Sequence, residues 1–543
     1  MAWQLADVIP LLGQVERHAR QGRWAVGMVA YEAAAAFDQA FQTLPPLEDI
    51  PLAAFAIFDA PSEAEEETLN AGFDCSHWHS DTPSSGFRKK VQCIRKGIAG
   101  GAYYQVNLTT RLRANFKGDP RAFFESLCEA QPGAYALFLD FRDWQIASVS
   151  PELFFAWSPA TAEIVARPMK GTAPLSQSAA DLRASAKDRA ENLMIVDLLR
   201  NDIARVAHQG SVRVPKLFTI DNFATLRQMT STIVGETLPD ADLAQIFAAL
   251  FPCGSITGAP KIAATQAIAA LETSPRGAYC GALGVVQPGG AALFSVGIRT
   301  VTIANGEAEC GIGGGITWDS DPAEEHGECQ IKRRFLLRAS AAFDLLESIK
   351  LEDGAYWLLE RHCDRLQRSA EHFGFPFDIE AVNRALQGTA EQNPTASYAV
   401  RLLLSRRGNI TIETRPLPFT PGHPSVALAE TAISSDDEFL HHKTTHRAVH
   451  EAHAPKSAGI FDTLLFNERG EITEFTRGNV AVELDGRFLT PPESSGLLPG
   501  TLRAELLAQG KLIERVLKHD DLRRAKALWF INSLRGFFPV RLG

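Results

Sequence analysis

The chain of 543 residues is too long for one ordinary hydrophobic core, and its length predicts about two to four domains. Its 45% hydrophobic and 22% charged residues are typical of a globular protein, and the net charge of −10 argues against a nucleic-acid-binding protein. We expect no secretion signal and no membrane span, because charges interrupt every apolar run before about 18 residues. Eight cysteines without metal-ligand spacing indicate reduced thiols and a cytoplasmic location.

The first half of the chain alternates predicted strands and helices. An acidic, then Ser/Pro-rich stretch over Glu63–Gly86 is interpreted as a surface excursion within the first domain. Hydrophobic periodicity then predicts strands over residues 145–149, 153–157, 162–166, 281–287 and 293–304. The same criterion predicts helices over residues 179–207, 260–271 and 324–347.

A second unit is expected to begin near residues 336–350, and we set the domains at 1–338 and 339–543. Its first element is a predicted helix over residues 356–373, which Gly374-Phe375-Pro376 ends. Arg406-Arg407-Gly408 predicts a tight hairpin between strands over 399–405 and 409–414. Further strands are predicted over residues 463–466, 479–484 and 528–531.

Acidic residues and glycine-rich segments between residues 100 and 335 are suited to a substrate with two carboxylates. Glu191 opens a predicted helical segment, and Glu328 and Lys332 share one face of another helix. Mg²⁺ prefers oxygen ligands and keeps few protein carboxylates, and glycine-rich turns at 253–261 and 311–321 let the backbone approach an anion. A solvated helix face is the alternative for the charges. Neither turn has a P-loop or dinucleotide pattern, which argues against ATP and NAD.

Seven motifs occur in the order in which chorismate-utilising enzymes carry them: YYQVNLTTRL (103–112), SPELFF (150–155), RPMKGT (167–172), RAENLMIVDLLRNDIARV (189–206), LFPCGSITGAPK (250–261), SVGIRT (295–300) and GIGGGITWDSDP…E…K (311–332). The chain resembles this family over about residues 85–335, and more weakly over 22–34. The resemblance implies an α/β sandwich of two packed sheets with outer helices.

The resemblance also implies roles for individual residues. Glu191 and Glu328 would bind Mg²⁺, and Glu152 would be the general acid that protonates the leaving 4-hydroxyl of chorismate. The substrate would be held by Arg299, Lys332 and the backbone around Gly258, Ala259, Gly313, Gly314 and Gly315.

Three positions discriminate within the family. Lys170 stands where anthranilate and isochorismate synthases usually carry alanine, and the resemblance implies that it attacks C2 of chorismate, for which desolvation must lower its pKa. A surface lysine in a turn is the alternative. Gln105 replaces the basic lysine of water-using isochorismate synthases, which favours ammonia as nucleophile. Gln228 replaces a family histidine, which disfavours anthranilate synthesis. Because no glutaminase motif is present, we expect a separate glutamine amidotransferase subunit or free ammonia.

The C-terminal unit combines Lys443, Glu474 and the segment LLPGTLRAELL (497–507). Pyridoxal phosphate (PLP) needs a lysine, a carboxylate at its pyridine nitrogen and donors for its phosphate. Gly500 and Thr501 at a helix start offer such donors, and Arg365 is the candidate cation.

Metal binding is the rival interpretation of residues 441–453. His442, His446 and His450 would share one face if this segment were helical. The segment lacks an HExxH pattern, and solvated histidines are the simpler reading.

LLERHCDRLQRSAEHFGF, HKTTHR, NERGEITEFTRGNVAVELDGRFLTPP and GLLPGTLRAELL resemble class IV, D-amino-acid-aminotransferase-like PLP enzymes over about residues 340–543. This resemblance implies a two-lobed α+β fold and a homodimer formed through this domain. It does not by itself separate a lyase from an aminotransferase; the preceding domain does. We therefore expect amination of chorismate at C4 to 4-amino-4-deoxychorismate, then elimination of pyruvate to 4-aminobenzoate for folate. A C-terminal aminotransferase, an anthranilate-synthase-like first domain and a degenerate, non-catalytic domain remain alternatives.

Overall fold

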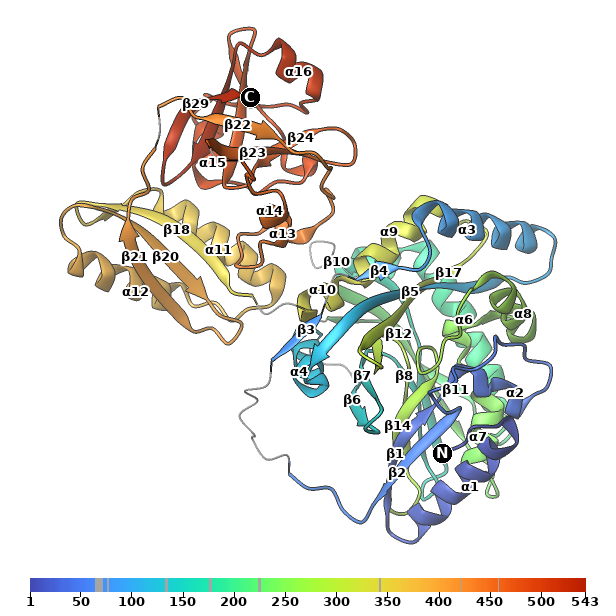
Figure 1. Cartoon of the computed structure of the whole chain (residues 1–543). Helices are drawn as coiled ribbons and strands as arrows, with labels where there is room; N and C mark the ends of the chain where they lie inside the picture. The colour runs from blue at the N-terminus through green and yellow to red at the C-terminus, as the bar shows by residue number, and fades with distance from the viewer. Residues whose placement is uncertain are drawn as a thin grey trace. The chain divides into compact units, whose positions relative to one another are not determined.

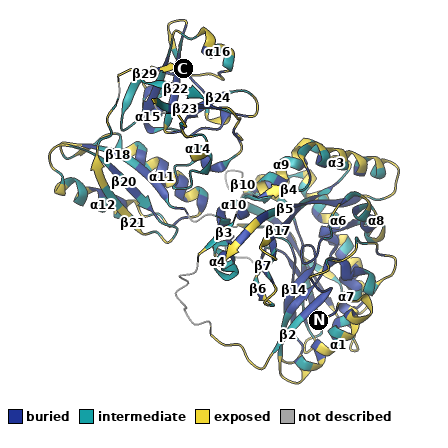
Figure 2. Cartoon of the chain, in the orientation of Figure 1, coloured by how far each residue is buried: buried dark blue, intermediate teal, exposed yellow. Residues whose placement is uncertain are grey.

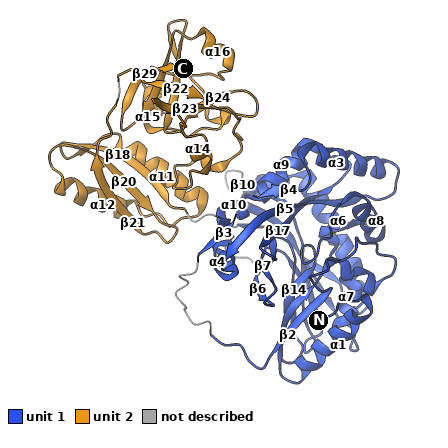
Figure 3. Cartoon of the chain, in the orientation of Figure 1, with its two compact units in different colours: residues 1–341 blue, residues 342–543 orange. Residues whose placement is uncertain are grey.

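The structure, a computed structural model, describes the chain except residues 64–71, 76–77, 132–134, 175–177, 223–225, 341–342, 421 and 458. Much of the expected surface excursion over 63–86 therefore lies outside the described residues. The chain divides into two compact units, residues 1–341 and 342–543 (Figure 3). None of the described helices has the length and apolar character needed to cross a membrane.

Two antiparallel sheets form the first unit. Among the described residues, nine strands make one sheet in the order β10 (Met169–Pro174), β12 (Leu226–Glu236), β9 (Glu163–Arg167), β8 (Leu153–Ser158), β15 (Ala292–Val296), β14 (Ala282–Val286), β1 (Trp24–Val29) and β2 (Ala53–Phe58), with β11 (Arg213–Asn222) on β12. Eight make the other, in the order β13 (Gly258–Ala259), β5 (Gln105–Gly118), β17 (Glu307–Ile316), β16 (Thr300–Ala304), β7 (Trp144–Ser150) and β6 (Tyr135–Asp140), with β3 (Phe73–Cys75) and β4 (His79–Ser80) on β5.

The two sheets pack face to face through apolar side chains. Met28 of β1 and Leu283 of β14 share one buried cluster with Trp144 and Ile146 of β7. Figure 2 shows the strands of this unit as largely buried and the helices as exposed on one side. This arrangement confirms the expected sandwich of two sheets with outer helices.

Helices cover the outer faces (Figure 1). The nine-stranded sheet shares its core with α1 (Leu5–Arg20), α2 (Ala34–Phe37), α6 (Ala186–Ala204) and α7 (Leu243–Leu250). A smaller cluster places α5 (Ala179–Ala184) on β10 and β12. The eight-stranded sheet is covered by α3 (Ser84–Ala99), α4 (Pro120–Ala130), α8 (Lys261–Leu271), α9 (Pro322–Lys332) and α10 (Arg334–Ser340).

Three predicted elements of this unit differ from the structure. The helix expected over 179–207 is broken at Ser185, whose side chain caps α6 by accepting a hydrogen bond from the backbone N–H of Asp188. The strand expected over 293–304 is two strands, because the backbone at Arg299 turns through a positive φ of 49°. The helix expected over 324–347 ends with α10, and residues 345–347 open strand β18.

The glycine segment over 311–321 was also predicted wrongly in part. Residues 311–316 belong to β17, where each pairs with β5, and only the residues after Ile316 turn toward α9. Periodicity cannot reveal such a strand, because glycines carry no hydrophobic side chain. The other strands and helices expected for this unit are present, with ends that differ by a few residues.

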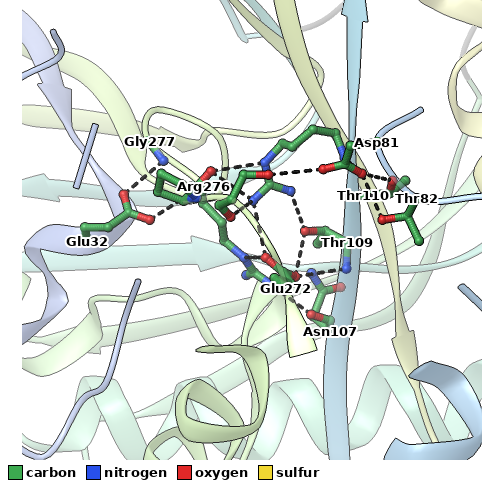
Figure 4. A network of polar contacts seen from close by, with 12 residues as sticks. Glu32, Asp81, Thr82, Asn107, Thr109, Thr110, Glu272, Arg276 and Gly277 are labelled. Atoms are coloured by element: carbon green, nitrogen blue, oxygen red, sulfur yellow. Dashed lines mark hydrogen bonds and ion pairs between the residues drawn. The ribbon is translucent and has the colours of Figure 1, made fainter. Parts of the chain in front are cut away.

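A buried ionic network fixes β5 to the segments around it (Figure 4). The carboxylate of Glu272 accepts hydrogen bonds from Thr109, Arg111 and Arg276, and the exposed fraction of each charged side chain is 3% or less. Arg276 also donates to the carbonyl of Asn107, two residues into β5. Charges this deeply buried are tolerated only when they are fully paired, so the network holds the start of β5 in one position.

The second unit has two lobes. The first is a four-stranded sheet, β19 (Ala355–Tyr356), β18 (Leu345–Glu352), β20 (Ser397–Leu404) and β21 (Ile410–Pro416), with α11 (Leu359–Phe373) and α12 (Ile379–Gln392). The second is an eight-stranded sheet in the order β24 (Ile472–Phe475), β23 (Ile460–Phe466), β22 (Ser425–Leu428), β29 (Gly536–Leu542), β28 (Ala527–Asn532), β25 (Gly478–Leu484), β26 (Arg487–Thr490) and β27 (Ile513–Glu514). Its helices are α13 (Glu438–His441), α14 (Ala448–Ala452), α15 (Thr501–Ala508) and α16 (His519–Arg524). The expected two-lobed fold is confirmed.

Candidate active sites

Strands β5, β10 and β17 bring Lys170 and Gln105 together at Gly315. A Cβ atom built on Gly315 would lie 2.1 Å from Nε2 of Gln105 and 2.8 Å from Nζ of Lys170. Both side chains therefore occupy the space that a side chain at position 315 would fill. The amide of Gln105 is fully buried, and neither its oxygen nor its nitrogen has a hydrogen-bond partner among the residues that the structure describes. A buried amide without partners is costly, which is expected where a polar ligand completes the site.

Glu152 lies in the turn between β7 and β8 and is almost fully buried. Burial raises the pKa of its carboxyl to about 7, against the opposing effects of the Ser255 hydroxyl and the Lys170 ammonium group. Within the described part of the chain, one carboxyl oxygen of Glu152 has no hydrogen-bond partner. A carboxyl group with this pKa is protonated in part near neutral pH and can donate a proton there.

The two predicted magnesium ligands, Glu191 and Glu328, lie on helices α6 and α9. Glu328 and Lys332 of α9 form an ion pair of 2.6 Å, as their spacing predicted, and Lys332 also donates to the carbonyl of Gly313 at 2.8 Å. Lys332 lowers the pKa of Glu328. Burial raises the pKa of Glu191, which lies inside α6 and not at its start, and the charge of Glu328 adds to that rise. Two carboxylates that repel each other across a half-buried site are suited to a cation between them.

Gly314 lies beside the same helix. A Cβ at this position would be 3.4 Å from Oε2 of Glu325 and 3.8 Å from Oε1 of Glu328. Glu325, which accepts a hydrogen bond from Ser320, is a further acidic side chain of this helix that was not predicted from the sequence. Its position three residues before Glu328 on the same helix was the available signal.

Three further residues, Gly258, Ala259 and Arg299, were predicted to hold the substrate. Gly258 and Ala259 form β13 and pair with Val106 and Gln105, and a Cβ on Gly258 would collide with the carbonyl of Gln105. The guanidinium of Arg299 lies over the ring of Phe335, and burial and the charge of Arg338 lower its pKa to about 10.

Gln228, the departure from the family histidine, is close to Lys170 along the sheet. It lies on β12 directly opposite Thr172 of β10, whose hydroxyl donates to the Gln228 amide oxygen at 3.3 Å. Lys170 is two residues before Thr172. The position of the missing histidine is therefore filled by a neutral hydrogen-bonding group.

In the second unit, Lys443 lies in the loop between α13 and α14. Burial lowers the pKa of its amine to about 8, and the positive charges of Arg365 and Arg447 add to the effect. His442 and His446 belong to the same loop and His450 to α14, so the continuous helical face required for the metal interpretation does not form. No three potential His, Cys, Asp or Glu metal ligands gather among the residues that the structure describes.

Glu474 is buried at the end of β24 with its oxygens in fixed directions. His450 lies 3.2 Å from Oε1, and the side chain of Asn479 and the backbone N–H of Leu498 each donate to Oε2 at 3.2 Å. An ionised carboxylate has about four acceptor positions, so Glu474 keeps capacity for one further N–H.

Arg365 of α11 and the start of α15 meet at the predicted phosphate site. Arg365 makes a two-point ion pair with Glu347 at 2.7 and 2.8 Å, and its remaining nitrogen is 3.3 Å from the carbonyl of Pro499. The Thr501 hydroxyl is 3.2 Å from His362, which also contacts Glu347. Glu347 and His362 were not predicted from the sequence, because the spacing of residues in a motif does not show which buried group neutralises the charge of an arginine.

Gly500 precedes α15 and provides close backbone approach. A Cβ there would meet Oδ1 of Asn479 at 2.0 Å, so no larger residue fits. The arrangement gathers a lysine with a lowered pKa, a carboxylate with spare acceptor capacity and a helix start beside an arginine. These are the groups that PLP requires.

Comparison with known proteins matches a family model to each of the two units. Residues 2–338 match the family model described as chorismate binding enzyme, and the chain belongs to this family. Residues 344–542 match the model for amino-transferase class IV. Both resemblances drawn from the motifs are confirmed.

Individual relatives are similar mainly to the first unit. Aminodeoxychorismate synthase component 1 of Escherichia coli (strain K12) is 40% identical over 260 residues, which cover 47% of this chain and 57% of the relative. Anthranilate synthase component 1 of Streptomyces coelicolor is 34% identical over 292 residues, or 52% of this chain and 57% of that protein. The chain thus spans just over half the length of these curated relatives. The crystal structure of anthranilate synthase component I from Streptococcus pneumoniae TIGR4 has a TM-score of 0.54 and 28% identity, over 61% of this chain and 85% of that one.

Proposed function

We propose that the chain converts chorismate and ammonia to 4-amino-4-deoxychorismate in its first unit, and converts that product to 4-aminobenzoate and pyruvate in its second. The observation that carries the proposal is the placement of Lys170 beside the unpartnered amide of Gln105, close enough to Glu152 for its charge to act on that carboxyl. Similarity to aminodeoxychorismate synthase component 1 supports it.

In the proposed first reaction, the chain supplies a nucleophile and an acid. Nζ of Lys170 forms a bond to C2 of chorismate while the C4–O bond breaks, and the hydroxyl leaves as water with the proton of Glu152. Ammonia then forms the C4–N bond as the Nζ–C2 bond breaks. The surplus proton of the new amine returns to Glu152, so the enzyme regains its starting state. The amide of Gln105 would accept a hydrogen bond from ammonia without competing as a base.

We propose that Glu191 and Glu328 hold Mg²⁺, which when bound would neutralise a carboxylate of chorismate. The mutual repulsion of the two side chains fits a cation between them. Mg²⁺ is commonly held by one or two protein carboxylates, with substrate and water oxygens as its other ligands. The N–H groups around Gly258 and Gly313–Gly315 would orient the substrate.

For the second reaction we propose that Lys443, Glu474, Arg365, Gly500 and Thr501 hold PLP. The bound cofactor would supply an electron sink for the carbanion that forms at C4 of the substrate. The amine of Lys443 removes the C4 proton. A pKa near 8 leaves about a tenth of such an amine neutral at pH 7, against about a third of a thousandth for an ordinary lysine. Glu474 would pair with the ring nitrogen of the bound cofactor. The C3–O bond breaks, and the enolpyruvyl group leaves and takes up a proton to become pyruvate.

Ammonia is proposed to come from a separate glutamine amidotransferase subunit, which the name "component 1" of the relatives supports. We also propose a cytoplasmic location and a homodimer formed through the second unit.

The direct test is product analysis. Purified chain with PLP is incubated with chorismate, an ammonium salt and Mg²⁺, and products are separated by chromatography. We expect 4-aminobenzoate and an equal amount of pyruvate without any keto acid. Anthranilate as product would contradict the first step. A requirement for a keto-acid acceptor would identify the second unit as an aminotransferase.

A further inference from the structure

A pocket of about 430 Å³ opens on the second unit next to the residues proposed to hold PLP. Its walls include Arg447, His450 and Glu451 from α14 and the residue before it, Phe461 from β23, and Thr476 and Arg477 from the turn between β24 and β25. This volume lies within the range of pockets that bind small molecules and accommodates a single six-membered ring with its substituents.

The pocket is connected to the proposed cofactor site through its own walls. His450 lies 3.2 Å from Glu474, and Thr476 follows Glu474 by two residues. Arg447 follows Lys443 by four residues, and its charge contributes to the lowered pKa of that amine. A molecule in this pocket would therefore contact His450, which lies against Glu474, and Arg447, whose charge acts on Lys443.

The positive charge of Arg447 is not neutralised within the described part of the chain. Its Nη2 donates to the carbonyl of Thr476 at 2.7 Å, and no carboxylate forms an ion pair with it. Arg477 differs, because it pairs at 3.2 Å with Asp462, whose side chain is fully buried. Glu451 lines the same pocket and is exposed.

We propose that this pocket binds a carboxylate of the substrate of the second reaction, with Arg447 as the specificity-determining residue. The proposal deepens the lyase function above and rests on it. A guanidinium has five N–H donors, and one bond to a carbonyl leaves enough of them for two parallel hydrogen bonds to a carboxylate. The substrate carries two carboxylates and the aromatic product carries one. An amino acid substrate of ordinary size would not need a second anion site beyond its own α-carboxylate.

The test measures binding to the full-length chain loaded with PLP. The probe is 4-aminobenzoate, its neutral match is 4-aminobenzamide, and affinities are obtained by calorimetry. We expect Arg447→Gln to weaken binding of the carboxylate about tenfold or more and to leave binding of the amide unchanged, because a charge-assisted pair is lost. Arg447→Lys should restore part of the affinity.

Glu451→Gln is a second variant, which should change the affinity for the carboxylate in the opposite direction. Removing this negative charge from the pocket wall should strengthen carboxylate binding about two- to threefold, since like charges repel. Because Glu451 is exposed, this variant remains folded and informative even if the Arg447 variants lose the cofactor, which the absorbance of bound PLP reports. Equal affinities of wild type and Arg447→Gln for 4-aminobenzoate, or a weaker affinity in Glu451→Gln, would overturn the proposal.

Kinetics separate this proposal from the function on which it rests. With 4-amino-4-deoxychorismate as substrate, Arg447→Gln should raise KM about tenfold. It should also lower kcat at neutral pH, because the lost charge no longer lowers the pKa of Lys443, and this loss of kcat should diminish as pH rises. If the wild type forms no 4-aminobenzoate from this substrate, the lyase function fails. If it does and KM is unchanged in the variant, the lyase function stands and the carboxylate subsite is wrong.

Discussion

The raised pKa of Glu152 can be tested through activity and stability together. We expect Glu152→Gln to remove at least 99% of amination activity, because an amide cannot supply the proton that the leaving hydroxyl needs. In the wild type, the fraction of Glu152 that can donate a proton should fall tenfold per pH unit above about pH 7, and this loss offsets any gain from deprotonation of the nucleophile, so kcat for amination should not rise with pH there. The assay follows chorismate consumption with the concentration of unprotonated ammonia held constant across the pH range.

The Glu152→Gln variant, which should lose amination activity, should be more stable than the wild type above about pH 7. In the folded chain the pKa of Glu152 rises from 4.5 to about 7, which corresponds to about 3 kcal/mol at about 1.36 kcal/mol per unit. The folded state then binds more protons than the unfolded state between those values, so this contribution is present below pH 4.5 and is lost as pH rises to 7. Glu152→Gln does not titrate. Its midpoint of thermal unfolding should equal that of the wild type near pH 4.5 and exceed it above pH 7.

Two results would refute this reasoning. One is an amination rate that keeps rising from pH 7 to pH 9. The other is a Glu152→Gln variant that is less stable than the wild type at pH 8. Glu163→Gln, an exposed position on β9, is the matched control and should alter neither property.

Three further predictions concern other positions. Lys170→Ala should abolish formation of 4-amino-4-deoxychorismate while leaving conversion of added 4-amino-4-deoxychorismate to 4-aminobenzoate intact; a wild-type amination rate would contradict the covalent role of Lys170. Lys443→Ala should accumulate 4-amino-4-deoxychorismate and lose the absorbance band near about 410–430 nm expected of PLP joined to a lysine; retention of that band would show that another amine holds the cofactor. Glu272→Gln should destabilise the first unit by about 3–5 kcal/mol in thermal unfolding, since it leaves two buried arginines without their carboxylate, whereas the exposed Glu307→Gln should change stability by less than about 1 kcal/mol.

Much of the fold followed from local patterns in the sequence. Alternating apolar residues located the strands around residues 145–166, and Gly374 and Gly408, both with positive φ, marked a helix end and a hairpin. The errors arose where a single residue redirects a regular pattern. Ser185 caps a new helix inside an apparently continuous one, and Arg299 adopts a left-handed conformation that its neighbours do not signal.

The sites were predictable to the extent that their residues stand in ordered motifs. Lys170, Gln105 and Glu152 belong to three motifs far apart in the chain, and only the pairing of β5 with β17 shows that Gly315 gives two of them room. The groups that balance charge were not predictable. Glu347 lies outside every motif, yet it determines how Arg365 is held.

The glycines of β17 also bear on how this site can change. Gly313 lies opposite Thr109, with 2.3 Å between its would-be Cβ and the carbonyl oxygen of Leu108, and that backbone cannot withdraw without breaking the sheet. Gly315 meets the ends of two side chains instead. Directed evolution toward other nucleophiles therefore has little freedom at Gly313, whereas a side chain at Gly315 would require Gln105 and Lys170 to move. Substitutions are expected to succeed at Gln105 and Lys170, where the reactive atoms can be exchanged while the glycines of β17 stay the same.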